Sequence, residues 1–195
     1  MDRAHEAEVD YLAERGESEI GERSNPCRFK KDEFVVYAAH GVGQITAIEV
    51  QTVAGASLEF IVVYFAKLKM RARVPTQKAS SVGLRELSAP AVIEQVRRTL
   101  SQAASKARTN WARLAKEYET KVKSGDIIAL AEVMRDLHRQ TAAYERSYSE
   151  QQFYTTALDR LSGEVALVEH ITEENAVLEL EGLLKARTGK DRNRS

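Results

Sequence analysis

The chain has 195 residues, of which 43% are hydrophobic and 30% charged, and its formal net charge is zero. This composition is typical of a globular protein with one medium or two small domains. The single cysteine, Cys27, excludes an internal disulfide framework. The longest apolar stretch, residues 60–66, is far shorter than the roughly 20 residues that span a bilayer. We therefore expect a cytoplasmic protein with no membrane partner.

The distribution of charge is more informative than its total. Residues 1–24 carry three basic and eight acidic side chains, whereas residues 25–88 carry nine and five. Residues 97–123 carry eight basic side chains against Glu117 and Glu119. A neutral average gives no reason to expect nucleic-acid binding, but this local excess is a first indication of a surface that faces a polyanion.

The first part of the chain, residues 1–28, is polar and acidic, and few apolar residues recur at helical spacing. We predict a mostly disordered extension. It is either a solvated tail or a segment that competes for a basic surface.

Residues 29–88 have the pattern of short β-strands. Phe34–Tyr37 is β-branched and aromatic, and residues 42–53 and 58–65 read as a hairpin around a break at 54–56. The strand at 71–74 ends at Pro75, where a strand must stop or lie on an edge. About five such strands predict a small, strongly bent sheet or partial barrel.

Residues 89–186 have the pattern of a compact domain of five helices, so the predicted fold class is α+β. Each helix has a residue suited to its start: Pro90, Thr109, Asp126, Ser149 (with Gln152 in a capping-box pattern) and Thr172. Gly125 suits the C-terminal end of the second helix. Residues 187–195 are predicted to be a disordered tail.

No catalytic constellation can be assembled from the sequence. The four histidines are scattered, and none has a cysteine or carboxylate at metal-ligand spacing on one helix face. The run His40–Gly43 lacks the length of a phosphate-binding loop, and Cys27 has no histidine nearby. We therefore predict no enzyme activity, no metal, no cofactor and no small-molecule substrate.

The basic segment contains the only tryptophan, Trp111, beside Asn110 and Arg113. An aromatic side chain among cations is typical of a surface that binds phosphates and inserts against bases. Trp111 also begins an amphipathic stripe with Ala115, Tyr118 and Val122, which is typical of a core anchor. The residues alone leave both interpretations open.

Several motifs resemble those of the CarD/CdnL family of bacterial transcription regulators. Residues 34–49, FVVYAAHGVGQITAIE, resemble the family's VVYPxHGVGxIxxIE. Further matches follow in order: RVP at 73–75, KA at 78–79, VGLR at 82–85, NWAR at 110–113, SGD at 124–126, AEVMRDL at 131–137, SYSE at 147–150 and ALDR at 157–160. The resemblance covers about residues 29–185.

The resemblance implies a Tudor-like N-terminal domain, like the RNA-polymerase-interacting domain of transcription-repair coupling factors. That domain is expected to dock on the polymerase β subunit by adding sheet edge to sheet edge. The helical domain is expected on promoter DNA at the upstream edge of the transcription bubble, where it stabilises the open complex. Base-specific reading is not expected, because minor-groove wedging depends mostly on the deformability of the DNA.

By position, the resemblance makes Trp111 the minor-groove wedge and Arg113 and Lys116 phosphate contacts. Asn110 supports them, and Arg108 is assigned to the same DNA-binding set. The polymerase-binding set is Arg73, Gln51, Val74 and Pro75. The alternative function is a protein-interaction module that binds RNA polymerase without direct DNA contact.

Four residues depart from the family pattern. Gln51 stands where some members carry an arginine used against the polymerase, and Leu114 replaces a second arginine after the tryptophan. Asp32 replaces a common turn glycine, and Ala38 replaces a common proline. We expect weaker or rearranged contacts at Gln51 and Leu114, and an altered first turn.

Overall fold

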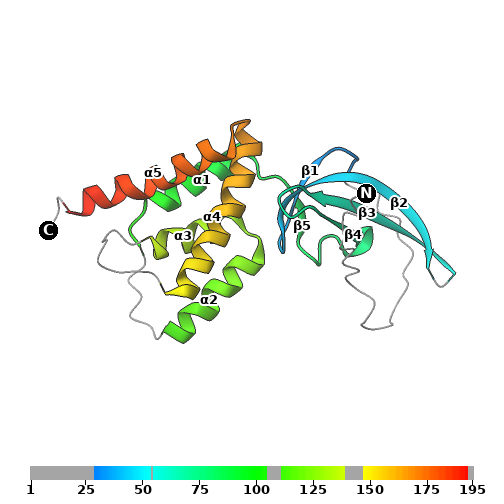
Figure 1. Ribbon diagram of the computed structural model, residues 1–195, viewed down its shortest axis with the longest axis horizontal. Coiled ribbons are helices and arrows are strands. Elements are labelled where there is room, and N and C mark those ends of the chain that lie inside the picture. The colour runs from blue at the N-terminus through cyan, green and yellow to red at the C-terminus, as the bar shows by residue number, and fades with distance from the viewer. Residues whose placement is uncertain (1–28, 54, 105–110, 139–146, 193–195) are drawn as a thin grey trace, which may run out of the picture.

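The computed structural model describes residues 29–53, 55–104, 111–138 and 147–192. Within these ranges an antiparallel sheet of five strands precedes five helices (Figure 1). The predicted α+β fold class, with a Tudor-like β-domain and a helical domain, is therefore confirmed. The predicted acidic extension, residues 1–28, lies outside the described residues.

The sheet has the strand order β4-β3-β2-β1-β5. Its strands are β1 (Phe34–Tyr37), β2 (Gly41–Val53), β3 (Ala56–Phe65), β4 (Met70–Pro75) and β5 (Leu84–Glu86). The predicted hairpin is β2 and β3, whose pairing shifts register at a bulge between Ile45 and Ala47. Because a bulge bends its strand, it contributes to the curvature of this small sheet. Pro75 ends β4, an edge strand, as its missing N–H requires.

One face of the sheet carries the core of the β-domain. Ile61, Val63 and Phe65 alternate along β3 and are at most 1% exposed. Gly43 of the neighbouring strand is required there, because a Cβ on it would lie 2.5 Å from Val63 Cγ1. The other face carries Tyr64 and the arginines of β4.

The helices are α1 (Pro90–Ser101), α2 (Trp111–Ser124), α3 (Ile127–Leu137), α4 (Tyr148–Glu169) and α5 (Glu173–Arg192). Helix α4 crosses the domain and packs against the other four, with Ala157, Leu161 and Val165 at most 1% exposed (Figure 1). Within the described ranges, no helix is long and apolar enough to cross a membrane.

Three of the predicted helix starts are confirmed. Pro90 is the first residue of α1. The Asp126 carboxylate accepts a hydrogen bond from Ile128 N at 2.8 Å, and the Thr172 hydroxyl accepts one from Asn175 N at 3.3 Å. Thr109 lies outside the described residues. Gly125 adopts a φ of 69° directly after α2, as a C-terminal glycine should.

The predicted capping box of Ser149 and Gln152 is wrong. The cap is Ser147, whose hydroxyl accepts from Glu150 N, while the Glu150 carboxylate accepts from Ser147 N at 2.9 Å. Both pairs have the required spacing, but the charged Glu150 also interacts favourably with the helix dipole. At the other end of the domain, α5 continues as a helix to Arg192, beyond the predicted boundary at residue 186.

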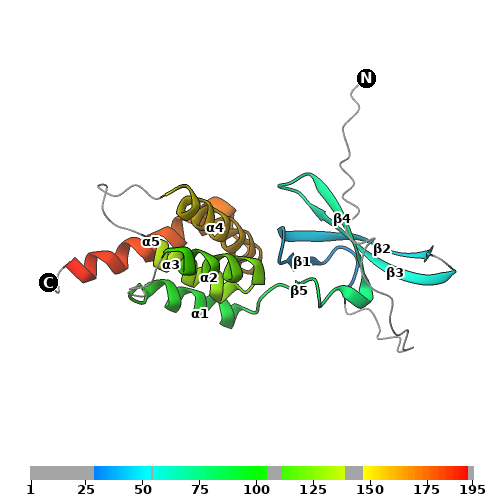
Figure 2. The ribbon, with the colours of Figure 1, turned by 90° about the horizontal axis from the view of Figure 1, so that it is seen from below.

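The two domains lie end to end, with β5 leading into α1 through residues 87–89 (Figure 2). Helix α4 packs against β2 at the junction. The turn between β3 and β4 also reaches the helical domain, where Lys67 Nζ lies 2.7 Å from Asp159 Oδ1 and pairs with Glu173.

Candidate nucleic-acid and protein interfaces

Trp111 is the first residue of α2 and its side chain is 37% exposed. Farther along the same stripe, Tyr118 and Val122 are 3% and 7% exposed and belong to the helical core. Trp111 is not part of that core. The structure therefore favours a partly exposed Trp111 over the core-anchor interpretation.

The cations of α2 fall into two kinds. Lys121 lies 2.9 Å from Glu117 and 3.1 Å from Glu132, and Lys123 lies 2.6 Å from Glu119. Arg113 and Lys116 are exposed, and no carboxylate among the described residues lies within 4 Å of either. These two cations are therefore the phosphate-binding candidates on α2 whose charge is not offset by a close ion pair.

Helical geometry places Arg113 and Lys116 on the same side of α2, away from the indole ring of Trp111. Residues three apart share a helix face, and a residue turns about 100° from its predecessor. Arg113 and Lys116 thus lie on the outward side of α2, whereas Trp111 continues the inward stripe beyond the core. The other predicted DNA contacts, Asn110 and Arg108, lie outside the described residues.

Elsewhere the basic segment is partly neutralised within the helical domain. Arg97 of α1 donates to Glu179 at 2.6 Å, to both oxygens of Glu169 at 2.5 and 2.6 Å, and to Glu94 at 2.5 Å. Hydrogen bonds to Glu179 and Glu169 raise the pKa of Arg97 further above its usual range. Arg97 is therefore a structural cation that joins α1, α4 and α5.

The structure brings Arg73 and Gln51 to one face of the sheet, next to Glu49. Arg73 Nε lies 4.0 Å from Glu49 Oε2, and Gln51 Nε2 donates to the same oxygen at 3.5 Å. Pro75 lies on this face, two residues beyond Arg73, and is half-buried. The surface is polar, largely exposed and next to the edge strand.

Val74 faces the opposite way. It is 4% exposed and packs in the core of the β-domain. Of the predicted polymerase-binding residues, Val74 can therefore offer a partner only its main chain.

Three of the four departures from the family pattern have structural explanations. Asp32 adopts a φ of 71°, a conformation that aspartate tolerates better than most residues, and its N–H donates to Ile45 O at 2.8 Å. Ala38 N donates to Gly83 O at 3.1 Å, a bond that proline could not make. Leu114 is half-buried against the helical core, so this position contributes packing.

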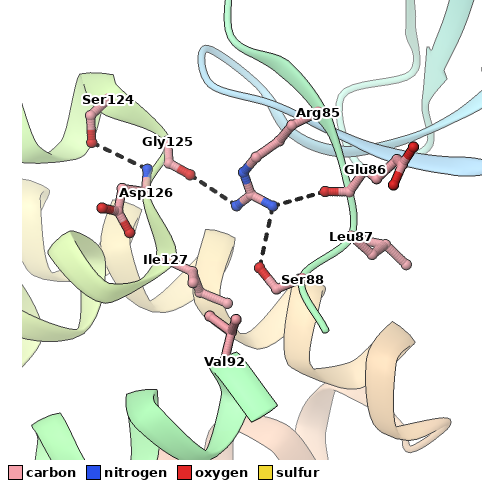
Figure 3. A pocket seen from close by; sticks show the side chains of 9 residues that line it. All are labelled: Arg85, Glu86, Leu87, Ser88, Val92, Ser124, Gly125, Asp126 and Ile127. Atoms are coloured by element: carbon pink, nitrogen blue, oxygen red, sulfur yellow. Dashed lines mark hydrogen bonds between the residues drawn. The ribbon is translucent and has the colours of Figure 1, made fainter. Parts of the chain in front are cut away.

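A pocket of about 440 Å³ lies between the end of β5 and the starts of α1 and α3 (Figure 3). Neither histidine nor cysteine lines it, and its arginine, Arg85, is already hydrogen-bonded to Gly125 O at 2.9 Å. Among the described residues, no group of three or more His, Cys, Asp or Glu side chains could hold a metal ion. The pocket's carboxylates are those of Glu86 and Asp126, and the Asp126 carboxylate already caps α3.

Comparison with known proteins finds a matching domain family for each half of the chain. Residues 29–88 match the CarD-like/TRCF RID domain, and residues 95–181 match the CarD C-terminal domain. The chain belongs to the CarD/CdnL family. A curated relative, named "Putative transcription factor YdeB", from Bacillus subtilis (strain 168), is 27% identical over 146 residues. That alignment covers 75% of this chain and 95% of the relative.

One buried acid at the junction was missed from the sequence. Glu164 of α4 is 1% exposed and pairs with Arg85 of β5. The sequence does contain a sign of it, because Glu164 lies three residues after the core residue Leu161, where an apolar side chain is expected. A carboxylate at such a position needs a buried partner.

Proposed function

We propose that this member of a family of transcription regulators acts at initiation. The β-domain (residues 29–88) binds the RNA polymerase β subunit, and the helical domain (residues 89–186) binds promoter DNA at the upstream edge of the bubble. Together they stabilise the open complex. The match to the RID domain supports the polymerase interaction in general terms.

The DNA contact is supported mainly by the N-terminal part of α2, which begins at Trp111. An exposed tryptophan at a helix terminus can enter the minor groove and unstack a base step, which apolar wedges do in other minor-groove proteins. Arg113 and Lys116, which have no carboxylate within 4 Å among the described residues, would bind phosphates on the outward face of the same helix. A ligand that binds the melted promoter better than the closed one shifts the population toward the melted state.

The polymerase contact is supported by the exposed face of β2 and β4. Arg73, Gln51 and Pro75 lie on this face, and β4 is an edge strand that can pair with a strand of the partner. Gln51 carries no charge, so among the proposed polymerase-binding residues only Arg73 supplies an ionic contact.

Trp111→Ala tests the DNA contact in a promoter-opening assay with RNA polymerase. We expect retained polymerase binding and an open complex whose lifetime falls about tenfold, since loss of base contact to an aromatic ring costs about 1–3 kcal/mol. Tyr148→Ala is the matched control, because Tyr148 is also an aromatic residue at a helix start and is 86% exposed. It should leave the lifetime unchanged.

The outcomes separate the two functions. A Trp111→Ala protein that folds by circular dichroism and stabilises the open complex as well as the wild type would support the protein-interaction module without DNA contact. For the polymerase, Arg73→Glu should abolish co-purification with the β subunit, while Lys78→Glu, an exposed control on the same domain, should not. Retained binding of Arg73→Glu would place the interface elsewhere.

A further inference from the structure

Three sequence motifs with no assigned role meet at the junction of the two domains. They are VGLR at 82–85, SGD at 124–126 and ALDR at 157–160. Arg85 from the first reaches the C-terminal end of α2, where the second motif lies (Figure 3). Arg160 from the third reaches the same end of α2. Helix α2 is the helix that begins at Trp111.

The buried carboxylate of Glu164 holds the first of these arginines. It accepts hydrogen bonds from Arg85 Nη1 at 2.6 Å and from Arg85 Nη2 at 2.8 Å, and also from Ser88 N at 2.9 Å. A two-pronged arginine–carboxylate pair fixes direction as well as distance. Since Glu164 belongs to α4 and Arg85 to β5, this pair fixes the two domains against each other.

Both arginines also bind the end of α2. Arg85 Nη2 donates to Gly125 O at 2.9 Å, and Arg160 Nη1 donates to Val122 O at 2.7 Å. Arg160 Nη2 donates in addition to Ala39 O of the β1–β2 turn, at 2.8 Å. The last carbonyls of a helix lack partners within it and carry the negative end of its dipole, so guanidinium groups bind there favourably.

The main chain is closely packed at the same point. A Cβ on Gly125 would lie 2.8 Å from both Cα and Cβ of Ala38, and one on Gly83 would lie 2.7 Å from Ala38 Cβ. The turn after β1 thus touches the end of α2 without an intervening side chain. The more exposed pairs of Lys67 add little, because solvent screens them.

We propose that Arg85, Arg160 and Glu164, the interdomain network, are positioning residues that set the direction of α2 relative to the sheet. The inference rests on the proposed function: Trp111 can meet DNA only where the polymerase-bound sheet places it. The covalent connection, residues 87–89, is short but leaves rotation open. The network removes that rotation and so raises the effective concentration of the wedge at the DNA.

Distances between spin labels test the network independently of transcription. The labels are placed at Ser57→Cys in β3 and Leu178→Cys in α5, both exposed, with Cys27→Ser removing the native thiol. Glu164→Gln should broaden the distance distribution. The matched control is Glu169→Gln, on the same helix, because both oxygens of Glu169 also accept from an arginine, in this case from Nη2 of Arg97, but within one domain. It should keep the wild-type distribution.

A distribution unchanged in Glu164→Gln would overturn the proposal. If that variant fails to fold, Arg85→Lys serves instead. The single ammonium group of lysine cannot hydrogen-bond both Glu164 and Gly125 O as the two nitrogens of the guanidinium group do. This variant too should broaden the distribution, and an unchanged one would count equally against the network.

The same variants are then compared in a promoter-opening assay, which measures the lifetime of the open complex. Glu164→Gln should keep polymerase binding and lose open-complex lifetime on the order of tenfold, as expected for lost effective concentration, while Glu169→Gln keeps it. A broadened distribution with full stabilisation would overturn the positioning role. If the wild-type chain itself fails to stabilise open complexes, the proposed function fails, and the distance measurement still decides the network.

Discussion

Replacing Gly125 by alanine perturbs the point where the end of α2 touches the β-domain. Gly125 has a φ of 69°, which an L side chain rarely adopts. The new Cβ would also lie 2.8 Å from the backbone Cα of Ala38, which cannot move aside like the end of a flexible side chain. The substitution should therefore destabilise the fold in two ways, through the backbone conformation of residue 125 and through the close contact with Ala38.

The magnitudes of these costs can be separated by a second glycine. The left-handed conformation costs a non-glycine residue about 1–2 kcal/mol, and overpacking adds about 1–3 kcal/mol. Gly55 has a φ of 83° and nothing within 4 Å of its Cβ position. Gly55→Ala should therefore lower the free energy of unfolding by about 1–2 kcal/mol, and Gly125→Ala should lower it by about 2–5 kcal/mol.

Urea denaturation followed by circular dichroism measures both free energies of unfolding. Equal losses in the two variants would show that no close contact exists at Gly125, and the packing at the domain junction would then be wrong. A biphasic transition in Gly125→Ala alone would show that the two domains had become uncoupled, as loss of the contact with Ala38 predicts.

Three further predictions concern binding, pH and helix capping. Arg113→Gln and Lys116→Gln each remove a phosphate contact. Each should therefore make the slope of log binding constant against log salt concentration shallower by about one. Burial, together with a nearby arginine, lowers the pKa of His40 below its usual 6.5, so the unfolded chain takes up the proton first. Stability should therefore fall as the pH drops below about 6.5, and His40→Gln should flatten this dependence. Ser147→Ala should cost about 1 kcal/mol of stability in urea, and Ser149→Ala much less.

Each of these has a contradicting result. An unchanged salt slope would mean that the outward face of α2 does not touch phosphate. A steeper loss of stability in acid for His40→Gln would reverse the sign expected from its burial. Equal effects at Ser147 and Ser149 would contradict the capping box at the start of α4.

The arrangement of strands and helices was predictable because it depends on local pattern. The alternation along residues 42–65 and the turn chemistry around 54–56 define the hairpin without any distant contact. The start of α4 was missed by two residues because Ser147–Glu150 and Ser149–Gln152 have the same spacing. The pattern cannot tell which of the two serines has the extended backbone that a cap requires.

The candidate surfaces were predictable only in part. The sequence identifies Trp111 and the cations near it, but not which cations have partners. Lys121 is neutralised by Glu132 of another helix, whereas Arg113 is not paired among the described residues. The sequence motif also does not reveal which way a side chain faces, and Val74 faces the core of the β-domain.

The interdomain network lay beyond local pattern altogether. Arg85 and Glu164 are 79 residues apart, and their pairing depends on how α4 crosses the helical domain. Asp32 shows a further limit: the sequence does not reveal that this aspartate adopts the left-handed conformation.

The central claim is that this chain stabilises a melted promoter, and a promoter-opening assay tests it most directly. Open-complex lifetime is measured with purified RNA polymerase, with and without the full chain, on one promoter. We expect a longer lifetime with the chain, and Trp111→Ala should reduce it without loss of polymerase binding. An unchanged lifetime with polymerase-bound wild-type chain would contradict it.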